Sequence, residues 1–354
     1  MAENTKIEWT RGEDGTAGAT WNVVTGCSVA TPGCTNCYAM RLAGTRLQHH
    51  PSRAGLTRET KAGPVWTGEV RFNEQWLTQP FQWKRPRKIF VAAHGDLFHE
   101  GVPDDVLDQV FAVMGLADWH TYQVLTKRSA RMRAYLSDPA TVARIEAAAD
   151  AILDAECERF NSTGARMRID RGLMGMLRTV NGKTDVQVTW PFPNIWLGVS
   201  VEDQRRADER RPDLEAVAAA GWTTFVSYEP ALEAVDWAGW EFLAWLISGG
   251  ESGPGARPTP PEGHRWARDF CAAHGIPYFF KQWGSWAPGE CVTRTSGIVE
   301  AAWYDDPSWT FGTESLSRTD GHIDDEPDVY RIGKAAAGRL LDGVQHDGFP
   351  EARR

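Results

Sequence analysis

Three cysteines lie within eleven residues near the start of this chain: Cys27, Cys34 and Cys37, in the string GCSVATPGCTNCYA. The other three cysteines, Cys157, Cys271 and Cys291, are scattered singly. Closely spaced thiols on a loop are typical of a metal site in a reducing compartment. Three thiolates fill three corners of a cubane iron–sulfur cluster and leave one iron open for chemistry, whereas structural zinc usually has four ligands. The spacing therefore favours an iron–sulfur site.

Short apolar runs that recur along the chain predict the elements that must position these cysteines. Runs such as IFVAA, IWLGVSV and AWLIS are apolar at consecutive positions, which is typical of parallel strands buried on both faces. We expect strands at Trp21–Gly26, Lys88–Ala93, Tyr122–Leu125, Asn194–Val201, Thr223–Ser227, Leu243–Ser248 and Pro277–Lys281.

Helical patterns alternate with these strands, which indicates βα units and an α/β fold. We expect helices at Asp104–Ala117, Asp203–Ala220 and His264–His274. Six or seven such units predict a partial or complete TIM-like (βα) barrel of six to seven parallel strands over residues 1–284. A helix from Pro139 to about Phe160, followed by a basic stretch, forms a predicted insertion over about residues 139–190. Residues 285–354 form a predicted C-terminal extension packed on the barrel, with a short helix at Gly333–Leu341.

Polar side chains follow every one of the seven predicted strands. In βα barrels the chemistry lies on the loops after the carboxyl ends of the strands, so these residues are the site candidates. A buried ring of charges also calls for a polar ligand, because burial of unpaired charge is costly. The positions are Cys27, His94, Asp96, His99, Thr126, Lys127, Arg128, Ser200, Glu202, Asp203, Ser227, Glu229, Glu251, Arg257, Lys281 and Gln282. The backbone of Gly249 and Gly250, after the sixth strand, could also approach a ligand closely.

Composition and charge restrict the function classes. The 354 residues are 24% charged and 42% hydrophobic, with a net charge of -9, and no run of eighteen apolar residues predicts a membrane span. We therefore expect a cytoplasmic globular protein with no membrane partner. The acidic charge is concentrated in Val299–Asp328, with nine acidic residues against one arginine, while Gly164–Lys183 holds five basic residues against one aspartate. That basic strip is either a solvated surface or a phosphate contact.

The cysteine motif resembles that of the radical S-adenosylmethionine (radical SAM) superfamily. The match is Cys–x6–Cys–x2–Cys followed by Tyr38 and Ala39, although the usual first gap is three residues rather than six. The NCYA ending is similar to the spore photoproduct lyase branch, which repairs a DNA lesion. The combination of KIEWT, CTNCYA, GDLFHE, VLTKR, WLGVSVED, GGESGPGARP, FFKQWG and GKAAAGRLLDG also resembles a phage-associated family of largely uncharacterised proteins with this three-cysteine motif.

The superfamily resemblance implies an activity and a set of residue roles. It implies a 4Fe–4S cluster on Cys27, Cys34 and Cys37, S-adenosylmethionine as cofactor, and a 5′-deoxyadenosyl radical that abstracts hydrogen from the substrate. A reductase or a flavodoxin- or ferredoxin-type protein would supply the electron, and a nucleic-acid base or nucleotide is the implied substrate class. Candidates for cofactor contacts are Ser200, Glu202, Asp96, Tyr38, Gly249 and Gly250. Catalytic candidates are Lys127, Glu229 and Lys281, and substrate-binding candidates are Arg128, Glu251, Arg257 and Gln282.

Two other classes remain open from the residues alone. A zinc-stabilised, non-catalytic adaptor in a phage–host conflict would need a fourth ligand from Cys157, Cys271 or a histidine. A metal-dependent barrel hydrolase would use His94, Asp96, Glu202 and Glu229 and would not need the cysteines.

Overall fold

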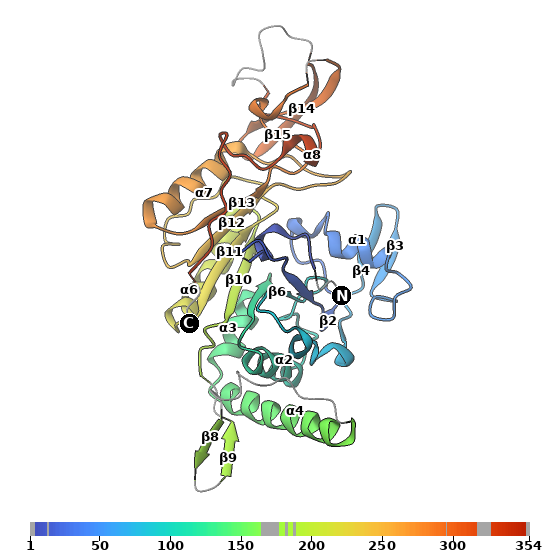
Figure 1. The fold of residues 1–354 in the computed structure, drawn as a ribbon. Coiled ribbons are helices and arrows are strands. Elements are labelled where there is room, and N and C mark those ends of the chain that lie inside the picture. The colour runs from blue at the N-terminus through green and yellow to red at the C-terminus, as the bar shows by residue number, and fades with distance from the viewer. Residues whose placement is uncertain are drawn as a thin grey trace.

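A computed structural model describes residues 4–12, 14–163, 177–180, 183–186, 189–294, 296–316 and 327–351. Its centre is a seven-stranded sheet curled into a half-barrel, with strand order β1-β6-β7-β10-β11-β12-β13 and every neighbouring pair parallel (Figure 1). This confirms the predicted partial barrel. The strands are β1 (Ala19–Trp21), β6 (Lys88–Val91), β7 (Thr121–Thr126), β10 (Ile195–Val201), β11 (Thr223–Tyr228), β12 (Trp245–Gly249) and β13 (Tyr278–Gln282).

The prediction of a first strand at Trp21–Gly26 is wrong. β1 ends at Trp21, and the chain then leaves the sheet to form β2 (Val24–Thr25), which pairs antiparallel with β5 (Arg71–Phe72). The apolar run bends because the Asn73 N–H donates to the Val23 carbonyl at 2.7 Å. An isolated parallel bridge between Gly26 and Gly95 returns the chain to the strand ends just before Cys27.

Helices cover the outer face of the sheet, as their apolar patterns predict. Residues of α2, α6 and α7 pack with outward-facing strand residues in one core. Local signals fix the helix ends: Asp203 accepts the Arg206 N–H at 2.8 Å at the start of α6, and Gly275 (φ 67°) ends α7. The helices are α1 (Tyr38–Gly44), α2 (Asp104–Leu116), α3 (Ser129–Ser137), α4 (Thr141–Thr163), α6 (Gln204–Ala219), α7 (Pro261–His274) and α8 (Lys334–Ala337).

Smaller elements complete the described part of the chain. The hairpin β3–β4 follows α1, and the hairpin β8–β9 follows α4 within the predicted insertion; the side chains of Cys157 and of the basic strip Gly164–Lys183 lie outside the described residues. These strands are β3 (Thr57–Thr60), β4 (Gly63–Trp66), β8 (Leu177–Val180) and β9 (Lys183–Val186). The 3-10 helices are η1 (Glu8–Thr10), η2 (Pro32–Cys34), η3 (Glu74–Trp76), η4 (Gln79–Gln82) and η5 (Gly289–Cys291).

The C-terminal region forms a separate antiparallel sheet at the top of Figure 1, in the order β15-β14-β16. One of its faces packs on the barrel, where Ala302 and Val329 contact Ala256 and Trp286. The short helix α8 is shorter than the predicted Gly333–Leu341. A domain boundary near residue 284 stays a prediction. The strands are β14 (Ile298–Asp305), β15 (Ser308–Ser315) and β16 (Val329–Tyr330).

The inner face of the half-barrel changes from aromatic to polar along its strands. Alternate residues of a strand share a face, so Trp196, Gly198, Ser200 and the following Glu202 lie on the inner side of β10. Near the amino ends of the strands, Trp196 belongs to a buried aromatic cluster, which fills that end of the half-barrel. The polar positions therefore lie together at the carboxyl ends. The other members of the cluster are Trp9, Phe90, Ala93, Phe225, Trp245, Ile247 and Phe279.

No helix among the described residues combines the length and the apolar character that a bilayer span requires.

Candidate functional site

The three clustered cysteines lie on one loop, residues 26–37, which we call the cysteine loop. Cys34 is buried within η2, and Cys27 and Cys37 are half-buried. The backbone holds the loop compact, because the Cys34 N–H donates to Thr31 at 2.9 Å and the Cys37 N–H donates to Cys34 at 3.2 Å. The loop ends where α1 begins, and none of its thiols forms a disulfide with any described residue.

The thiols of this loop lie close enough to affect one another. The pKa of Cys27 is raised to about 12, mainly by burial and also by the charges of Asp96, Cys34 and Cys37, against the opposing effect of Arg128. Burial also raises the pKa of Cys37, with a further contribution from Cys34. At Cys27 and Cys37 the protein alone favours the neutral thiol, so a metal that binds these two groups must displace their protons.

The three thiols of this loop are a donor set that an iron–sulfur cluster can use. Among the described residues, no three Cys, His, Asp or Glu side chains converge in a way that could hold one metal ion. Each cysteine of a cubane binds a different iron, so its ligands need not converge on one point. Cys271 and Cys291 lie in or against the main core, and neither completes a ligand group with the loop within the described chain. The His94, Asp96, Glu202 and Glu229 set of the hydrolase alternative does not converge either.

Glu202, at the carboxyl end of β10, holds the middle of the cysteine loop. Its side chain has 0% exposure, and it accepts hydrogen bonds from the Thr31 hydroxyl and from Arg210 at 2.9 Å. Lys127 Nζ lies 3.4 Å away. Burial alone would raise the carboxyl pKa, but Lys127 and Arg210 outweigh burial and lower it to about 2. Glu202 is therefore a buried anion that is already paired with the protein.

A glycine lets the loop approach this carboxylate. A Cβ on Gly33 would lie 3.0 Å from the Glu202 carboxyl group, a contact that is tighter than nearly all real Cβ contacts. Gly33 therefore lets the cysteine loop pack closely on the end of β10, and a side chain there would require the Glu202 carboxyl group to shift by a few tenths of an ångström.

Arg128, after β7, holds the start of the loop. Its guanidinium donates to Ser28 Oγ at 2.7 Å and to Cys27 Sγ at 3.5 Å. Asp96, after β6, accepts from Arg128 at 3.1 Å, from the Thr126 hydroxyl at 2.6 Å and from the Lys127 N–H at 3.0 Å. The carboxylate of Asp96, a predicted cofactor contact, thus orients Arg128 and the end of β7.

The loop after β12 holds the end of the cysteine loop. Glu251 accepts from Asn36 at 2.7 Å and forms an ion pair with Arg257 at 2.7 Å. Arg257 also donates to the Pro32 carbonyl at 2.9 Å. These two predicted substrate-binding residues are therefore paired with each other and with the cysteine loop. Tyr38, half-exposed at the start of α1, donates to the Ala93 carbonyl at 2.6 Å after β6.

The remaining candidates lie around the ends of β10 to β13. Lys281 Nζ lies 2.7 Å from both carboxylate oxygens of Glu229, and Gln282 Nε2 lies 3.4 Å from the same group. Gly249 lies beside this pair, since a Cβ there would be 3.6 Å from the Glu229 carboxyl carbon. Gly250 serves close packing, because a Cβ there would be 2.0 Å from the Trp283 carbonyl oxygen. Ser200 is buried on the inner face of β10 and is the direct register partner of Ser227 on β11.

Three residues that hold the site were not among the sequence candidates: Thr31, Asn36 and Arg210. Thr31 and Asn36 lie within the cysteine motif, and their polar side chains between ligand candidates were the available signal. Arg210 follows Glu202 by eight residues, or about two helical turns, so its return to the strand end could have been inferred from the α6 pattern.

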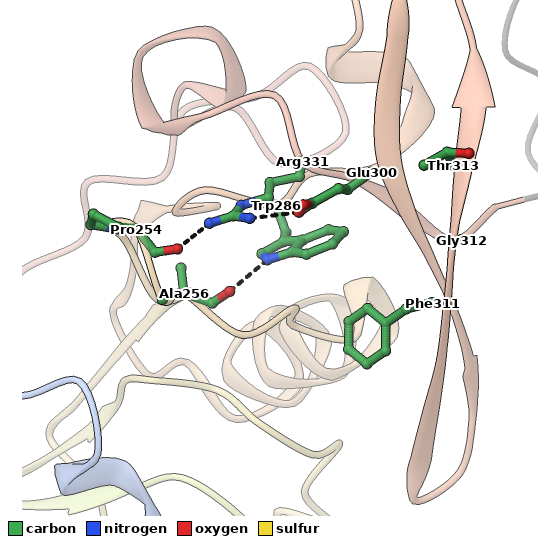
Figure 2. A pocket seen from close by; sticks show the side chains of 9 residues that line it. Pro254, Ala256, Trp286, Glu300, Phe311, Gly312, Thr313 and Arg331 are labelled. Atoms are coloured by element: carbon green, nitrogen blue, oxygen red, sulfur yellow. Dashed lines mark hydrogen bonds and ion pairs between the residues drawn. The ribbon is translucent and has the colours of Figure 1, made fainter. Parts of the chain in front are cut away.

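A cleft of about 530 Å³ lies behind the β12 loop and not at the strand ends. Figure 2 shows Trp286 and Phe311 in its wall, with Arg331 between Glu300 and the Pro254 carbonyl. The Arg331–Glu300 distance is 2.5 Å, and both side chains are partly exposed. The cleft and the cysteine loop share a wall, because the Gly255 carbonyl accepts from Asn36 at 2.6 Å.

Comparisons with known proteins give a family but no curated relative. The family model described as "Protein of unknown function (DUF5131)" matches residues 4–350. No curated protein matches the chain. Two solved chains are similar over 65% of this chain: "Spore photoproduct lyase complexed with dinucleoside spore photoproduct", at 13% identity and TM-score 0.31, and a mutant of spore photoproduct lyase, at 14% identity and TM-score 0.30. Only 55% of each solved chain is covered, and at these scores the likeness carries no argument.

Proposed function

This chain belongs to the DUF5131 family of proteins of unknown function, and we propose that it is a radical SAM enzyme that acts on a nucleic-acid base or nucleotide. The observation that carries the proposal is the position of the cysteine loop. Three free thiols lie on a loop that is fastened to the carboxyl ends of β6, β7 and β10 and to the loop after β12. That is the end of a parallel half-barrel at which chemistry is expected.

The cysteines would hold the cluster, and the strand ends would hold the cofactor and substrate. When bound, a 4Fe–4S cluster and S-adenosylmethionine together supply a 5′-deoxyadenosyl radical for hydrogen abstraction. Ser200, on the inner face of β10, would offer its hydroxyl to the cofactor ribose. Glu202 would act by fixing the loop rather than by direct contact, because its oxygens already accept bonds from Thr31 and Arg210.

The pair Lys281–Glu229 is the candidate for contact with the substrate. The two side chains face each other from the carboxyl ends of β11 and β13, the strands on either side of β12, and each is about one-fifth exposed. Lys281 can donate to acceptor atoms of a base, and Glu229 can accept from an exocyclic amino group. The net charge of -9 disfavours a long polyanion. A single nucleotide or an extruded base therefore fits this site better than an extended duplex.

Anaerobic reconstitution tests the proposal. We expect about four irons per chain and formation of 5′-deoxyadenosine from S-adenosylmethionine with dithionite as reductant. Cys→Ala changes at Cys27, Cys34 and Cys37 should each abolish both. The matched control is Cys291→Ala, because Cys291 is half-buried against the main core, away from the loop.

Two results would contradict the proposal. Stoichiometric zinc without iron would favour a structural metal site. Full iron content in the three loop variants would place the cluster elsewhere. Binding to single nucleotides and to oligonucleotides at low salt, where phosphate contacts are strongest, tests the substrate class separately.

A further inference from the structure

We propose that Arg128 is a positioning residue that donates a hydrogen bond to the Cys27 sulfur and raises the reduction potential of the cluster. This inference rests on the proposed function, because it assigns Cys27 to an iron–sulfur cluster. It replaces the expectation that Arg128 contacts the substrate.

Both terminal nitrogens of Arg128 are directed at the cysteine loop. Nη1 lies 3.5 Å from Cys27 Sγ, and Nη2 lies 2.7 Å from Ser28 Oγ and 3.3 Å from the Ser28 carbonyl oxygen. The residue is only 7% exposed, so water does little to screen its charge. Among the arginines in the part of the chain that the structure describes, Arg128 donates a hydrogen bond to a thiol of the cysteine loop.

Asp96 fixes the guanidinium in this orientation. It accepts from Arg128 Nη1 at 3.1 Å and is itself held by the Thr126 hydroxyl and the Lys127 N–H. A planar guanidinium can donate to several acceptors in one fixed geometry. Arg128 cannot turn away from Cys27 without losing bonds to Asp96 and Ser28. Glu100, at 3.5 Å from Arg128 Nε, is largely exposed and adds little to this restraint.

The neighbouring cation makes a different contact. Lys127 Nζ lies 3.4 Å from Glu202, and that carboxylate also accepts from Arg210. These two consecutive cations therefore have different partners. Lys127 is paired with Glu202, which holds the middle of the cysteine loop, and Arg128 contacts the Cys27 sulfur.

The direction of the effect follows from charge. One-electron reduction adds negative charge to a cluster, and part of that charge lies on its sulfur ligands. A fixed N–H donor with a full positive charge stabilises the reduced form more than the oxidised form, and hydrogen bonds to the sulfurs are known determinants of cluster potential. Loss of Arg128 should therefore make the cluster harder to reduce.

The test compares two arginines of adjacent turns. Arg128→Met removes the donor, and Arg131→Met is the matched control because Arg131, on α3, contacts Asp104 at 2.8 Å and the Val102 carbonyl instead. Anaerobically reconstituted full-length proteins are titrated with redox mediators, and the reduced cluster is followed by electron paramagnetic resonance. We expect about a tenfold lower equilibrium constant for reduction in Arg128→Met, a shift of about 59 mV to more negative potential, and no shift in Arg131→Met.

The outcomes separate the two proposals. An unchanged potential in an Arg128→Met protein that retains its iron would overturn the role of Arg128 and leave the cluster assignment standing. If Arg128→Met does not hold iron, Arg128→Lys is titrated instead. An ammonium lacks the guanidinium fork, so we expect a lower potential than in the unchanged protein, and an equal potential would overturn the inference. Absence of any iron–sulfur cluster in the unchanged protein would overturn the proposed function itself.

Discussion

The strand ends around the cysteine loop and the cleft behind the β12 loop contain the same kinds of groups but differ in burial. Each has an acid–arginine pair, and the two regions share a wall at Gly255. The Glu202 and Arg210 side chains are 0% and 5% exposed, whereas Glu300 and Arg331 are 54% and 30% exposed. The charges of a buried pair have lost their hydration and are stabilised only by their protein partners. A charge in an exposed pair can be hydrated by water when its partner is lost. The charged side chains at the strand ends are therefore held in one arrangement, whereas those of the cleft can change their partners.

The largest expected effect is the loss of the buried charge at Glu202. Glu202→Gln leaves Arg210 and Lys127 facing a neutral amide, and breaking a buried pair costs about 3–5 kcal/mol. The matched control Glu300→Gln removes an exposed charge and should cost less than about 1 kcal/mol. Urea unfolding at pH 7 measures both, and equal losses would remove the distinction between the two regions.

The pH dependence of the stability contributed by Glu202 gives a second prediction. The pKa of Glu202 is lowered from 4.5 to about 2, so its ionised form is favoured in the folded state. The resulting stability is fully present above the unfolded pKa and is lost as pH falls from about 4.5 to about 2, by about 3 kcal/mol in all. The gap in free energy of unfolding between the unchanged protein and Glu202→Gln should therefore narrow over this interval. A constant gap would show that the glutamate is not a stabilised anion.

A single methyl group at the loop tests how closely the strand end is packed. Gly33→Ala places a Cβ 3.0 Å from the Glu202 carboxyl group, which Arg210 and Thr31 hold in place. Overpacking of this kind costs about 1–3 kcal/mol. We expect that loss in urea unfolding, together with a lower iron content after reconstitution. An unchanged free energy of unfolding together with an unchanged iron content would show that the cysteine loop can move to accommodate the methyl group.

The smallest effect is expected in the cleft. Arg331→Met breaks the half-exposed pair with Glu300 and should change the free energy of unfolding by less than about 1 kcal/mol. Iron content and 5′-deoxyadenosine formation should stay unchanged. A loss of several kcal/mol would mean that the C-terminal sheet depends on this pair as strongly as the cysteine loop depends on Glu202.

The fold was largely predictable because continuous apolar runs such as IWLGVSV mark strands buried on both faces. The first strand was misplaced because the run at Val23 and Val24 bends out of the sheet through contacts with Asn73, which lies far along the chain. The antiparallel C-terminal sheet was not predicted, since β15 has no buried residue and its sequence SWTFGTES lacks a continuous apolar run.

The location of the candidate site at the strand ends could be predicted, but the hydrogen-bond and ion-pair partners of its residues could not. Residues at the ends of parallel strands must lie together, so Asp96, Glu202 and Glu251 were identified from sequence. Their partners depend on long-range packing: Thr31 meets Glu202 across 171 residues, and Asn36 meets Glu251 across 215. Nothing local in the sequence specifies such contacts. This is why the sequence did not show that several of the predicted ligand-binding residues contact the cysteine loop.

The way residues 346–349 return to the barrel has a consequence for biosynthesis. The Phe280 N–H donates to the His346 carbonyl at 3.0 Å, the Gly348 N–H donates to Tyr278 at 2.9 Å, and Phe349 packs on Trp245 within the aromatic end of the half-barrel. The exposed edge of β13 is therefore closed by a segment translated about seventy residues later. Until that segment leaves the ribosome, the edge of β13 in the nascent chain is unpaired, so the half-barrel can close only after almost the whole described chain has been made.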